Sequence, residues 1–111
     1  MGTRNLQAIT AQLRMKFSDL KYDLFQINPV DNPVCSCGVS EETSSHYFFE
    51  CRLYENERHI LFDTLYDILA EIDVDFTVDV LLSGSTTLPF VTNKQIIYAV
   101  HTYIISTNRF N

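Results

Sequence analysis

The sequence predicts a small all-α domain built around one loop that is rich in cysteine and histidine. Apolar residues recur at steps of three and four along most of the 111 residues, which is the spacing of amphipathic helices. Only three glycines and three prolines interrupt the chain, too few for a turn-rich all-β fold. With 46% hydrophobic residues, a chain of this length can bury one core, so we expect one compact domain.

Three sections of the chain are expected to form this domain. Residues 1–28 form an N-terminal amphipathic helical arm, and residues 29–51 hold the segment with the cysteines. Residues 52–111 form a helical core of a long helix, a short helix and a C-terminal helix.

The spacing of apolar residues in the N-terminal arm predicts helical structure, with Thr3 as the N-cap residue. Its apolar residues form one stripe: Leu6, Ile9, Leu13, Phe17, Leu20, Leu24 and Ile27. Ser18 can cap a new helix as readily as continue an old one, so one long helix and two shorter helices both fit. We favour a break near Ser18 and Asp19. Pro29 and Pro33 then end the arm.

All three cysteines lie with one histidine in the second section, at the spacing C-x-C-x8-H-x4-C. Three thiolates and one imidazole form the soft four-ligand set that zinc prefers, and a structural site of this kind is coordinatively closed. The pattern therefore predicts a structural zinc site with the ligands Cys35, Cys37, His46 and Cys51.

Local signals support a turn and then a helix in this segment. Gly38 suits the tight turn after the first two cysteines, and a very short β-hairpin across Val34 to Val39 is compatible with it. Thr43 is a good N-cap residue, and Glu41 and Glu42 precede it near the positive end of the helix dipole.

The third section begins with the longest predicted helix, from Arg52 to about Ile72. Its apolar face consists of Leu53, Ile60, Leu61, Leu65, Ile68, Leu69 and Ile72. His59 lies beside this stripe, and we expect a histidine at the surface or the edge of the core rather than a fifth ligand.

A short helix and a last helix complete the core. Thr77 is predicted to cap a helix from Val78 to Ser83, which Gly84 stops. Thr92 is predicted to cap the last helix, which ends near Asn108. The apolar stripe of that helix is Ile96, Ile97, Val100, Tyr103 and Ile104, and His101 lies off it and is expected to be exposed. The long helix and the last helix carry the two strongest stripes, so we expect them to pack together.

Two stretches resemble catalytic motifs without completing them. Asp73 and Asp75 form the kind of carboxylate pair that binds magnesium, but a third carboxylate and a strand pattern are missing. This favours a loop, or a role of the two carboxylates at the N-terminal end of a helix dipole. The connector from Ser83 to Pro89 lacks the Gly-Lys pair of a phosphate loop. Since no nucleophile is paired with a base, we do not expect an enzyme or a small-molecule substrate.

Charge bears on possible partners. A net charge of −6 argues against autonomous binding of nucleic acid, which depends on clustered Lys and Arg. Residues 1–24 carry four basic and two acidic side chains, so only this part could face a phosphate backbone. An ordinary solvated helix face explains the same charges.

Several motifs resemble the cysteine–histidine segment near the C-terminus of non-LTR retrotransposon reverse transcriptases. They are Pro33–Gly38, Glu41–Thr43, His46–Phe49, Cys51 and Tyr54–Arg58, with Leu13–Phe17, Leu20 and Tyr22 upstream and Val80–Ser85, Thr92–Asn93 and Arg109–Asn111 downstream. The resemblance covers nearly the whole chain from Leu13. The polymerase and endonuclease domains of that family have no counterpart in these residues.

The resemblance implies a zinc-stabilised accessory module that contacts RNA or DNA. The contacts it suggests are Arg14, Lys16, Lys21 and Arg52 with the aromatic residues Tyr47 and Phe48. The alternative is a purely structural zinc, with an acidic surface that docks on another protein or on a polymerase domain.

The expected location is intracellular, in the cytoplasm or the nucleus. Three clustered cysteines fit metal binding in a reducing compartment better than a disulfide framework. The residues from Met1 to Arg4 do not open a signal peptide, and no apolar run reaches the length of a membrane span.

Overall fold

The computed structural model describes residues 5–29, 32–70, 72 and 75–110. The elements in chain order are α1 (Leu6–Met15), α2 (Lys21–Ile27), the π-helical turn η1 (His46–Glu50), the 3-10 turn η2 (Arg52–Tyr54), α3 (Glu55–Ile68), α4 (Val78–Ser83) and α5 (Phe90–Thr107). No strand forms among these described residues, and one isolated antiparallel bridge joins Val34 to Glu41. The all-α prediction is therefore confirmed for this part of the chain.

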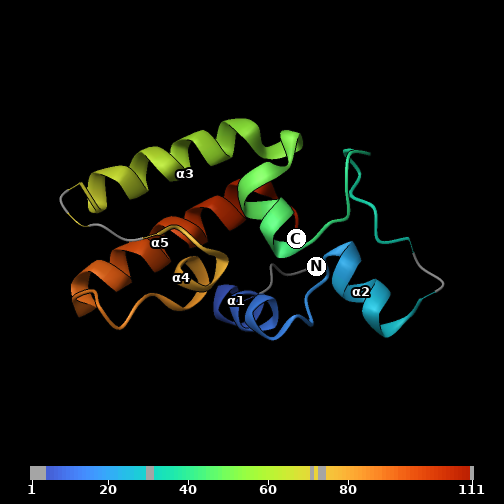
Figure 1. Cartoon of the computed structure of the whole chain (residues 1–111), viewed down its shortest axis with the longest axis horizontal. Helices are drawn as coiled ribbons and strands as arrows, with labels where there is room; N and C mark the ends of the chain where they lie inside the picture. Colours follow the sequence, from blue (N-terminus) through green and yellow to red (C-terminus); the bar gives the residue numbers. More distant parts are fainter. Residues whose placement is uncertain (1–4, 30–31, 71, 73–74, 111) are drawn as a thin grey trace.

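The helices form two groups along a molecule of 45 × 27 × 25 Å. Helices α3 and α5 run antiparallel and side by side, and α4 contacts both α5 and α1 (Figure 1). Helix α2 and the loop that follows it lie at one end of the molecule, beside the end of α5 that leads to the C-terminus (Figure 1). Within the described residues, no helix has both the length and the apolar character that crossing a membrane requires.

The packing of the long helix against the last helix is confirmed. Helices α3 and α5 contact each other, and Leu65 of α3 and Val100 of α5 are each 0% exposed. The buried hydrophobic core consists of Ile9, Leu13, Leu20, Tyr47, Phe48, Leu61, Leu65, Leu69, Leu81, Leu82, Leu88, Ile96, Ala99, Val100, Tyr103, Ile104 and Phe110.

The N-terminal arm is broken, as favoured above. Helix α1 ends where Lys16 takes the left-handed conformation (φ 60°), and α2 starts at Lys21. Asn5 caps α1 by accepting a hydrogen bond from Gln7 N–H at 2.8 Å, and the predicted cap Thr3 lies outside the described residues. Because the helix is broken, the apolar residues of the predicted stripe no longer lie on one face. Three of them are exposed: Phe17, Leu24 and Ile27.

The long helix is shorter than predicted. The chain forms η2 first, and the α-helix proper runs only from Glu55 to Ile68. The core side of α3 is marked by buried Leu61 and Leu65 at a spacing of four. Ile60 precedes Leu61 by about 100° around the helix and therefore faces solvent. Three members of the predicted stripe are exposed: Leu53, Ile60 and Ile72.

The capping of α4 is confirmed, whereas the start of α5 was predicted wrongly. Thr77 accepts a hydrogen bond from Val80 N–H at 3.2 Å, and Gly84 ends α4 with φ 75°. Helix α5 begins at Phe90, so Thr92 lies inside its first turn, and Asn108 ends the helix in the left-handed conformation.

Asn93 holds the connector before α5. Its side chain accepts a hydrogen bond from Ser85 N–H and donates one to the Ser85 carbonyl, both at 2.9 Å. A Cβ on Gly84 would lie 2.6 Å from the Asn93 Oδ1 atom, so this position needs glycine for space as well as for its positive φ. Of the acidic pair considered above, Asp73 lies outside the described residues and Asp75 is exposed on a loop.

Truncation of apolar side chains should lower stability on the buried face of the helix pair and have little effect on its exposed face. We expect Leu65→Ala to lower the free energy of unfolding by about 2–5 kcal/mol, because it leaves a cavity. Val100→Ala should cost less, since it removes fewer carbons. Val91→Ala makes the same change at a position that is 64% exposed on the same helix, and should stay within about 0.5 kcal/mol. Denaturant unfolding checks all three, and equal values for the two valine variants would contradict the packing.

Candidate metal centre

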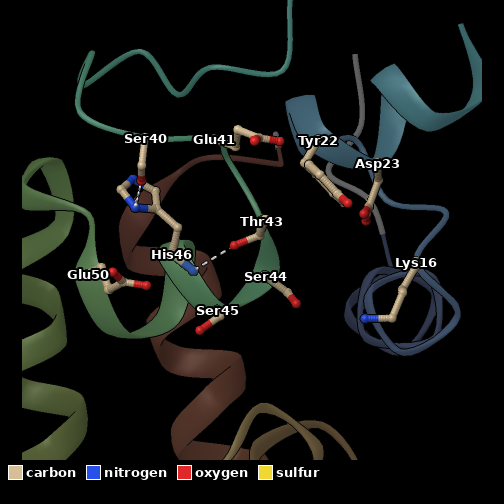
Figure 2. A pocket seen from close by; sticks show the side chains of 10 residues that line it. All are labelled: Lys16, Tyr22, Asp23, Ser40, Glu41, Thr43, Ser44, Ser45, His46 and Glu50. Carbon is tan, nitrogen blue, oxygen red and sulfur yellow. Dashed lines mark hydrogen bonds between the residues drawn. The ribbon is translucent and has the colours of Figure 1, made fainter. Parts of the chain in front are cut away.

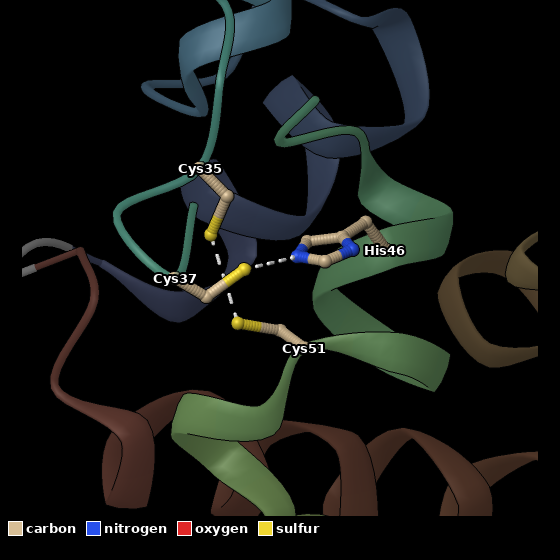
Figure 3. Close-up of side chains that lie close together, drawn as sticks. All are labelled: Cys35, Cys37, His46 and Cys51. Atoms are coloured by element: carbon tan, nitrogen blue, oxygen red, sulfur yellow. Dashed lines mark hydrogen bonds between the residues drawn. The ribbon is translucent and has the colours of Figure 1, made fainter. Parts of the chain in front are cut away.

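The four predicted ligands meet at one buried point (Figure 3). Their ligand atoms all lie within 4.8 Å of one another. The Cys35 and Cys51 sulfurs are 3.6 Å apart, and the Cys37 sulfur lies 3.3 Å from Nε2 of His46. None of the four side chains is more than 4% exposed. The structure therefore brings together every residue of the predicted ligand set.

These distances fit a tetrahedral metal site. Bonds of about 2.3 Å to sulfur and 2.0–2.1 Å to nitrogen place two sulfurs roughly 3.8 Å apart and a sulfur and a nitrogen roughly 3.6 Å apart. The observed separations of 3.6 and 3.3 Å are close to these values. A disulfide would need about 2.05 Å, and all three cysteines are free thiols. The cluster could hold one metal ion with only small movements of its side chains.

A π-turn brings His46 and Cys51 to the same side of their segment. Cys51 N–H donates a hydrogen bond to the His46 carbonyl at 2.8 Å, which closes a turn of i→i+5 type. In a regular α-helix, residues five apart point about 140° away from each other. Thr43 caps the segment by accepting a hydrogen bond from His46 N–H at 3.1 Å. The helix after Thr43 was predicted, but its π geometry was not.

The two other ligands lie on a tight turn. Gly38 has φ 79°, and its N–H donates to the Cys35 carbonyl at 2.9 Å, which confirms the role expected for this glycine. The predicted hairpin across Val34 to Val39 is reduced to the single bridge between Val34 and Glu41. Burial raises the pKa of the Cys35 thiol, while the Val39 N–H that bonds to the Cys37 sulfur lowers the pKa of Cys37.

Polar groups around the ligands orient them. The Ser40 hydroxyl oxygen lies 2.9 Å from Nδ1 of His46. If Nδ1 carries the proton and donates it to Ser40, Nε2 keeps its lone pair and faces the sulfurs, which is the tautomer that a metal requires. Arg52 donates to the Cys37 carbonyl at 2.9 Å, and Arg58 donates to the Cys51 carbonyl. Both arginines therefore hold the backbone of a ligand.

A buried ion pair ties the metal loop to the rest of the chain. Glu42 is 2% exposed and accepts hydrogen bonds from Nε and Nη2 of Arg109 at 2.7 and 2.6 Å. Glu42 also accepts a bond from Lys21 N–H at 2.7 Å, at the start of α2. Arg109 in turn donates to the Asp19 carbonyl at 2.9 Å. One carboxylate thus joins the metal loop, the N-terminal arm and the C-terminal end.

Hydrogen bonding sets the charge state of this pair. Burial alone would raise the pKa of the Glu42 carboxyl, but the bonds from Arg109 and from Lys21 N–H hold that pKa below its ordinary value. The hydrogen bonds to Glu42 in turn raise the pKa of Arg109. Glu42 was expected only to favour a helix dipole, and Arg109 entered only through the family resemblance. No local signal could have paired two residues that are 67 positions apart.

Tyr47 and Phe48 belong to the core and not to a binding surface. Both side chains are 0% exposed. The Tyr47 ring meets the rings of Phe48, Tyr103 and Phe110 edge to face at 4.9–5.4 Å. Tyr103 donates a hydrogen bond to the Tyr47 carbonyl at 2.6 Å. The predicted stacking of these two aromatic residues on bases is therefore corrected, because neither ring is accessible.

The four basic residues proposed to contact phosphates do not form one cluster of unengaged cations. Arg14 and Lys16 are exposed, but they line different surface pockets. Lys21 is half-buried and donates to the Ser36 hydroxyl at 3.2 Å. Arg52 is held by the Cys37 carbonyl.

A surface pocket of about 640 Å³ opens beside the metal centre (Figure 2). Segment 40–46 forms one wall and supplies His46, while Lys16, Tyr22 and Asp23 face it from the N-terminal arm (Figure 2). The lining contains three carboxylates and a single lysine. A phosphate or another anion would meet mostly negative charge in this pocket.

The other histidines lie outside the cluster. His59 is exposed, as expected. His101 is half-buried rather than exposed, and this burial lowers the pKa of its imidazole. No family model, curated protein or solved structure matches this chain. The resemblance to retrotransposon reverse transcriptases therefore rests on the sequence motifs alone.

Removing the partner of Glu42 should destabilise the fold in a pH-dependent way. We expect Arg109→Ala to lower the free energy of unfolding by about 3 kcal/mol at pH 7, because it leaves a buried carboxylate without a counterion. The Glu42 pKa is lowered in the folded wild type, so the ion pair stabilises fully above the ordinary value of about 4.3 and loses this effect as the pH falls from that value through the lower pKa of the folded state.

The difference in unfolding free energy between Arg109→Ala and the wild type should therefore become smaller as the pH falls below about 4.3. Denaturant unfolding across this range measures it. Arg14→Ala, at an exposed arginine, is the control and should change stability by less than about 0.5 kcal/mol. A constant difference at all pH values would contradict the assignment of the pair.

Proposed function

We propose that Cys35, Cys37, His46 and Cys51 hold one zinc ion, and that this zinc is structural. The observation that carries the proposal is the convergence of four buried ligand atoms within 4.8 Å. Three sulfurs and one imidazole nitrogen match the ligand preference of zinc. With four protein ligands, no coordination position stays open for water or substrate, which favours a structural role over a catalytic one.

The bound metal would stabilise the cysteine-containing loop, which has little hydrophobic core of its own. The three cysteines form a small cluster of their own, separate from the main hydrophobic core. Segment 38–41 is exposed and buries little apolar area. Metal coordination would fix the turn with Cys35 and Cys37 against the π-turn with His46 and Cys51. Because π-turn η1 packs on α3 and α5, the metal would stabilise the helix pair as well.

We propose further that this zinc-stabilised module acts by docking on another protein or domain. Net charge −6 and the engagement of Arg52, Arg58 and Arg109 with protein acceptors support this role. Its three free thiols fit a reducing, intracellular compartment.

A nucleic-acid-associated accessory role is the second candidate. The family resemblance favours it, and the exposed cations Arg14 and Lys16 at the end of α1 could contact phosphates. In that reading the chain would serve a reverse transcriptase as its C-terminal tail. The acidic pocket that Lys16 lines and the burial of Tyr47 and Phe48 weigh against a strong interaction.

Metal removal should unfold the chain. Structural zinc in finger peptides binds with an apparent free energy of about 10–16 kcal/mol, so stability should follow zinc content. We expect elemental analysis of protein purified without chelator to give one zinc per chain, and chelation to lower the melting temperature. Affinity should fall as the pH drops, because protons compete for thiolates and imidazole.

Ligand variants provide the matched control for this prediction. His46→Ala should abolish stoichiometric zinc binding, whereas His59→Ala makes the same change at an exposed histidine and should leave zinc content and melting temperature unchanged. A chelated protein that melts at the temperature of the loaded one would refute the structural zinc.

A salt titration separates the two candidate roles. If the module docks on protein, the zinc-loaded chain should not bind single-stranded RNA or nicked duplex DNA at low salt. Micromolar binding that weakens steeply with salt, and that Arg14→Ala with Lys16→Ala reduces, would instead support the nucleic-acid role. Fluorescence anisotropy of labelled oligonucleotides measures both outcomes.

A further inference from the structure

An apolar groove runs along the outer side of the α3 and α5 pair. Two neighbouring surface hollows of about 420 and 300 Å³ lie between these helices. They share Thr64, Tyr98 and Ala99 as lining residues, so they form one continuous groove. None of these residues belongs to the metal centre or contacts it.

Large apolar side chains line this groove and yet face solvent. Ile60 of α3 is 65% exposed, and Tyr98 and Val91 of α5 are 76% and 64% exposed. Val91 and Tyr98 of this groove are spaced by seven residues along α5 from each other, and Tyr98 by seven from Ile105, which is 57% exposed but lines neither hollow. This is the spacing of a seam that packs against another helix. Contiguous exposed apolar surface of this kind marks an interaction site.

The charges of the groove are balanced, unlike those of the whole chain. Glu57 is the charged residue in the lining of one hollow, and Lys94 is the charged residue in the lining of the other. The two therefore lie towards opposite ends of the groove. The two charges cancel within the lining of the groove.

We propose that this groove binds a second copy of the chain in a symmetric pair. A two-fold axis near Thr64 and Tyr98 would lay α3 and α5 of one copy against the same helices of the other. It would also place Glu57 of each copy near the partner's Lys94. Along the helix axes Glu57 lies about 10 Å and Lys94 about 6 Å from this two-fold axis, on opposite sides of it, so the rotation brings Glu57 of one copy to the end of the face that holds Lys94 of the other. The two long side chains would then span the spacing of roughly 10 Å between the helices. A face with opposite charges at its two ends is complementary to itself.

The area of this face indicates how tightly the two copies would bind each other. Helix α5 has 18 residues and is about 27 Å long. Two helices packed roughly 10 Å apart then offer on the order of 500 Å² per copy, below the roughly 800 Å² of a standard stable interface. We therefore expect a weak dimer with a dissociation constant of roughly 10–100 μM.

Sedimentation equilibrium of the zinc-loaded full chain between 5 and 500 μM, roughly bracketing that constant, tests the proposal. The wild type should change from monomer to dimer across this range. Tyr98→Glu should remain monomeric, because it places a charge at the centre of the groove. Tyr66→Glu makes the same change at a tyrosine that is 60% exposed on α3 but does not line the groove, and should dimerise as the wild type does.

Swapping the charges of Glu57 and Lys94 gives a second test, in which the apolar surface of the groove stays intact. Glu57→Lys alone and Lys94→Glu alone should each weaken the dimer about tenfold, since each brings like charges together across the axis. The double variant restores opposite charges and should regain most of the wild-type affinity. A monomer at 500 μM, or a double variant no tighter than the single ones, would overturn the proposal and leave the groove to a different partner.

The dimer rests on the zinc-stabilised fold proposed above, and the two can fail separately. Zinc content and far-ultraviolet circular dichroism are measured for every variant. A folded wild type that holds one zinc but stays monomeric refutes the dimer alone. A wild type without zinc refutes the metal proposal, whatever its oligomeric state.

Discussion

The hydrogen bond from Cys51 N–H to the His46 carbonyl is the constraint on which the arrangement of the chain depends. It closes the π-turn and so places two ligand side chains, five residues apart, on one side of the segment. Tyr47 and Phe48 lie between these ligands and are directed into the main core. The same turn therefore faces the metal cluster on one side and the helix pair on the other. An α-helical turn would not present both sets of residues correctly.

Polar and aromatic contacts make the cluster part of the whole fold. Glu42 and Arg109 connect its loop to the N-terminal arm and to the C-terminal end. Tyr103 and Thr107 of α5 hydrogen-bond to Tyr47 on the π-turn. These contacts reach three distant parts of the chain. Displacement of the π-turn would therefore disturb the N-terminal arm, α5 and the C-terminal end as well as the ligands. This arrangement favours one cooperative unit over a metal knuckle attached to an independent bundle.

Periodicity and local chemistry were sufficient to predict much of this fold. The stripes around Leu65 and Val100 identify the packed helix pair, and Thr77 with Gly84 bounds α4, because these signals are local. The ligand set was also predictable, since few residue types bind soft metals. The π-turn was not, because no residue pattern in segment 46–51 distinguishes it from an α-helical turn. The ion pair of Glu42 and Arg109 depends on tertiary structure alone.

Aromatic residues beside a metal motif were the least predictable feature. A tyrosine followed by a phenylalanine fits a stacking surface as well as a core, and only the position of α5 decides between these roles. Similarly, Ile60 and Leu61 are adjacent and both apolar, yet one is exposed and the other is buried. A small rotation of a helix about its axis decides which of two adjacent apolar residues is buried. The apolar spacing in the sequence does not reveal that rotation.

The separation of contacts along the chain bears on how a nascent chain assembles. The sulfurs of Cys35 and Cys51 are 16 positions apart, whereas the bonds from Tyr103 to Tyr47 and from Arg109 to Glu42 span 56 and 67 positions. Loop-closure entropy favours the short loop, so the ligands can meet once Cys51 has left the ribosome. Until α5 follows, the rings of Tyr47 and Phe48 lack the surface that covers them. During synthesis this aromatic pair is the natural contact for a chaperone, or for another unfinished chain.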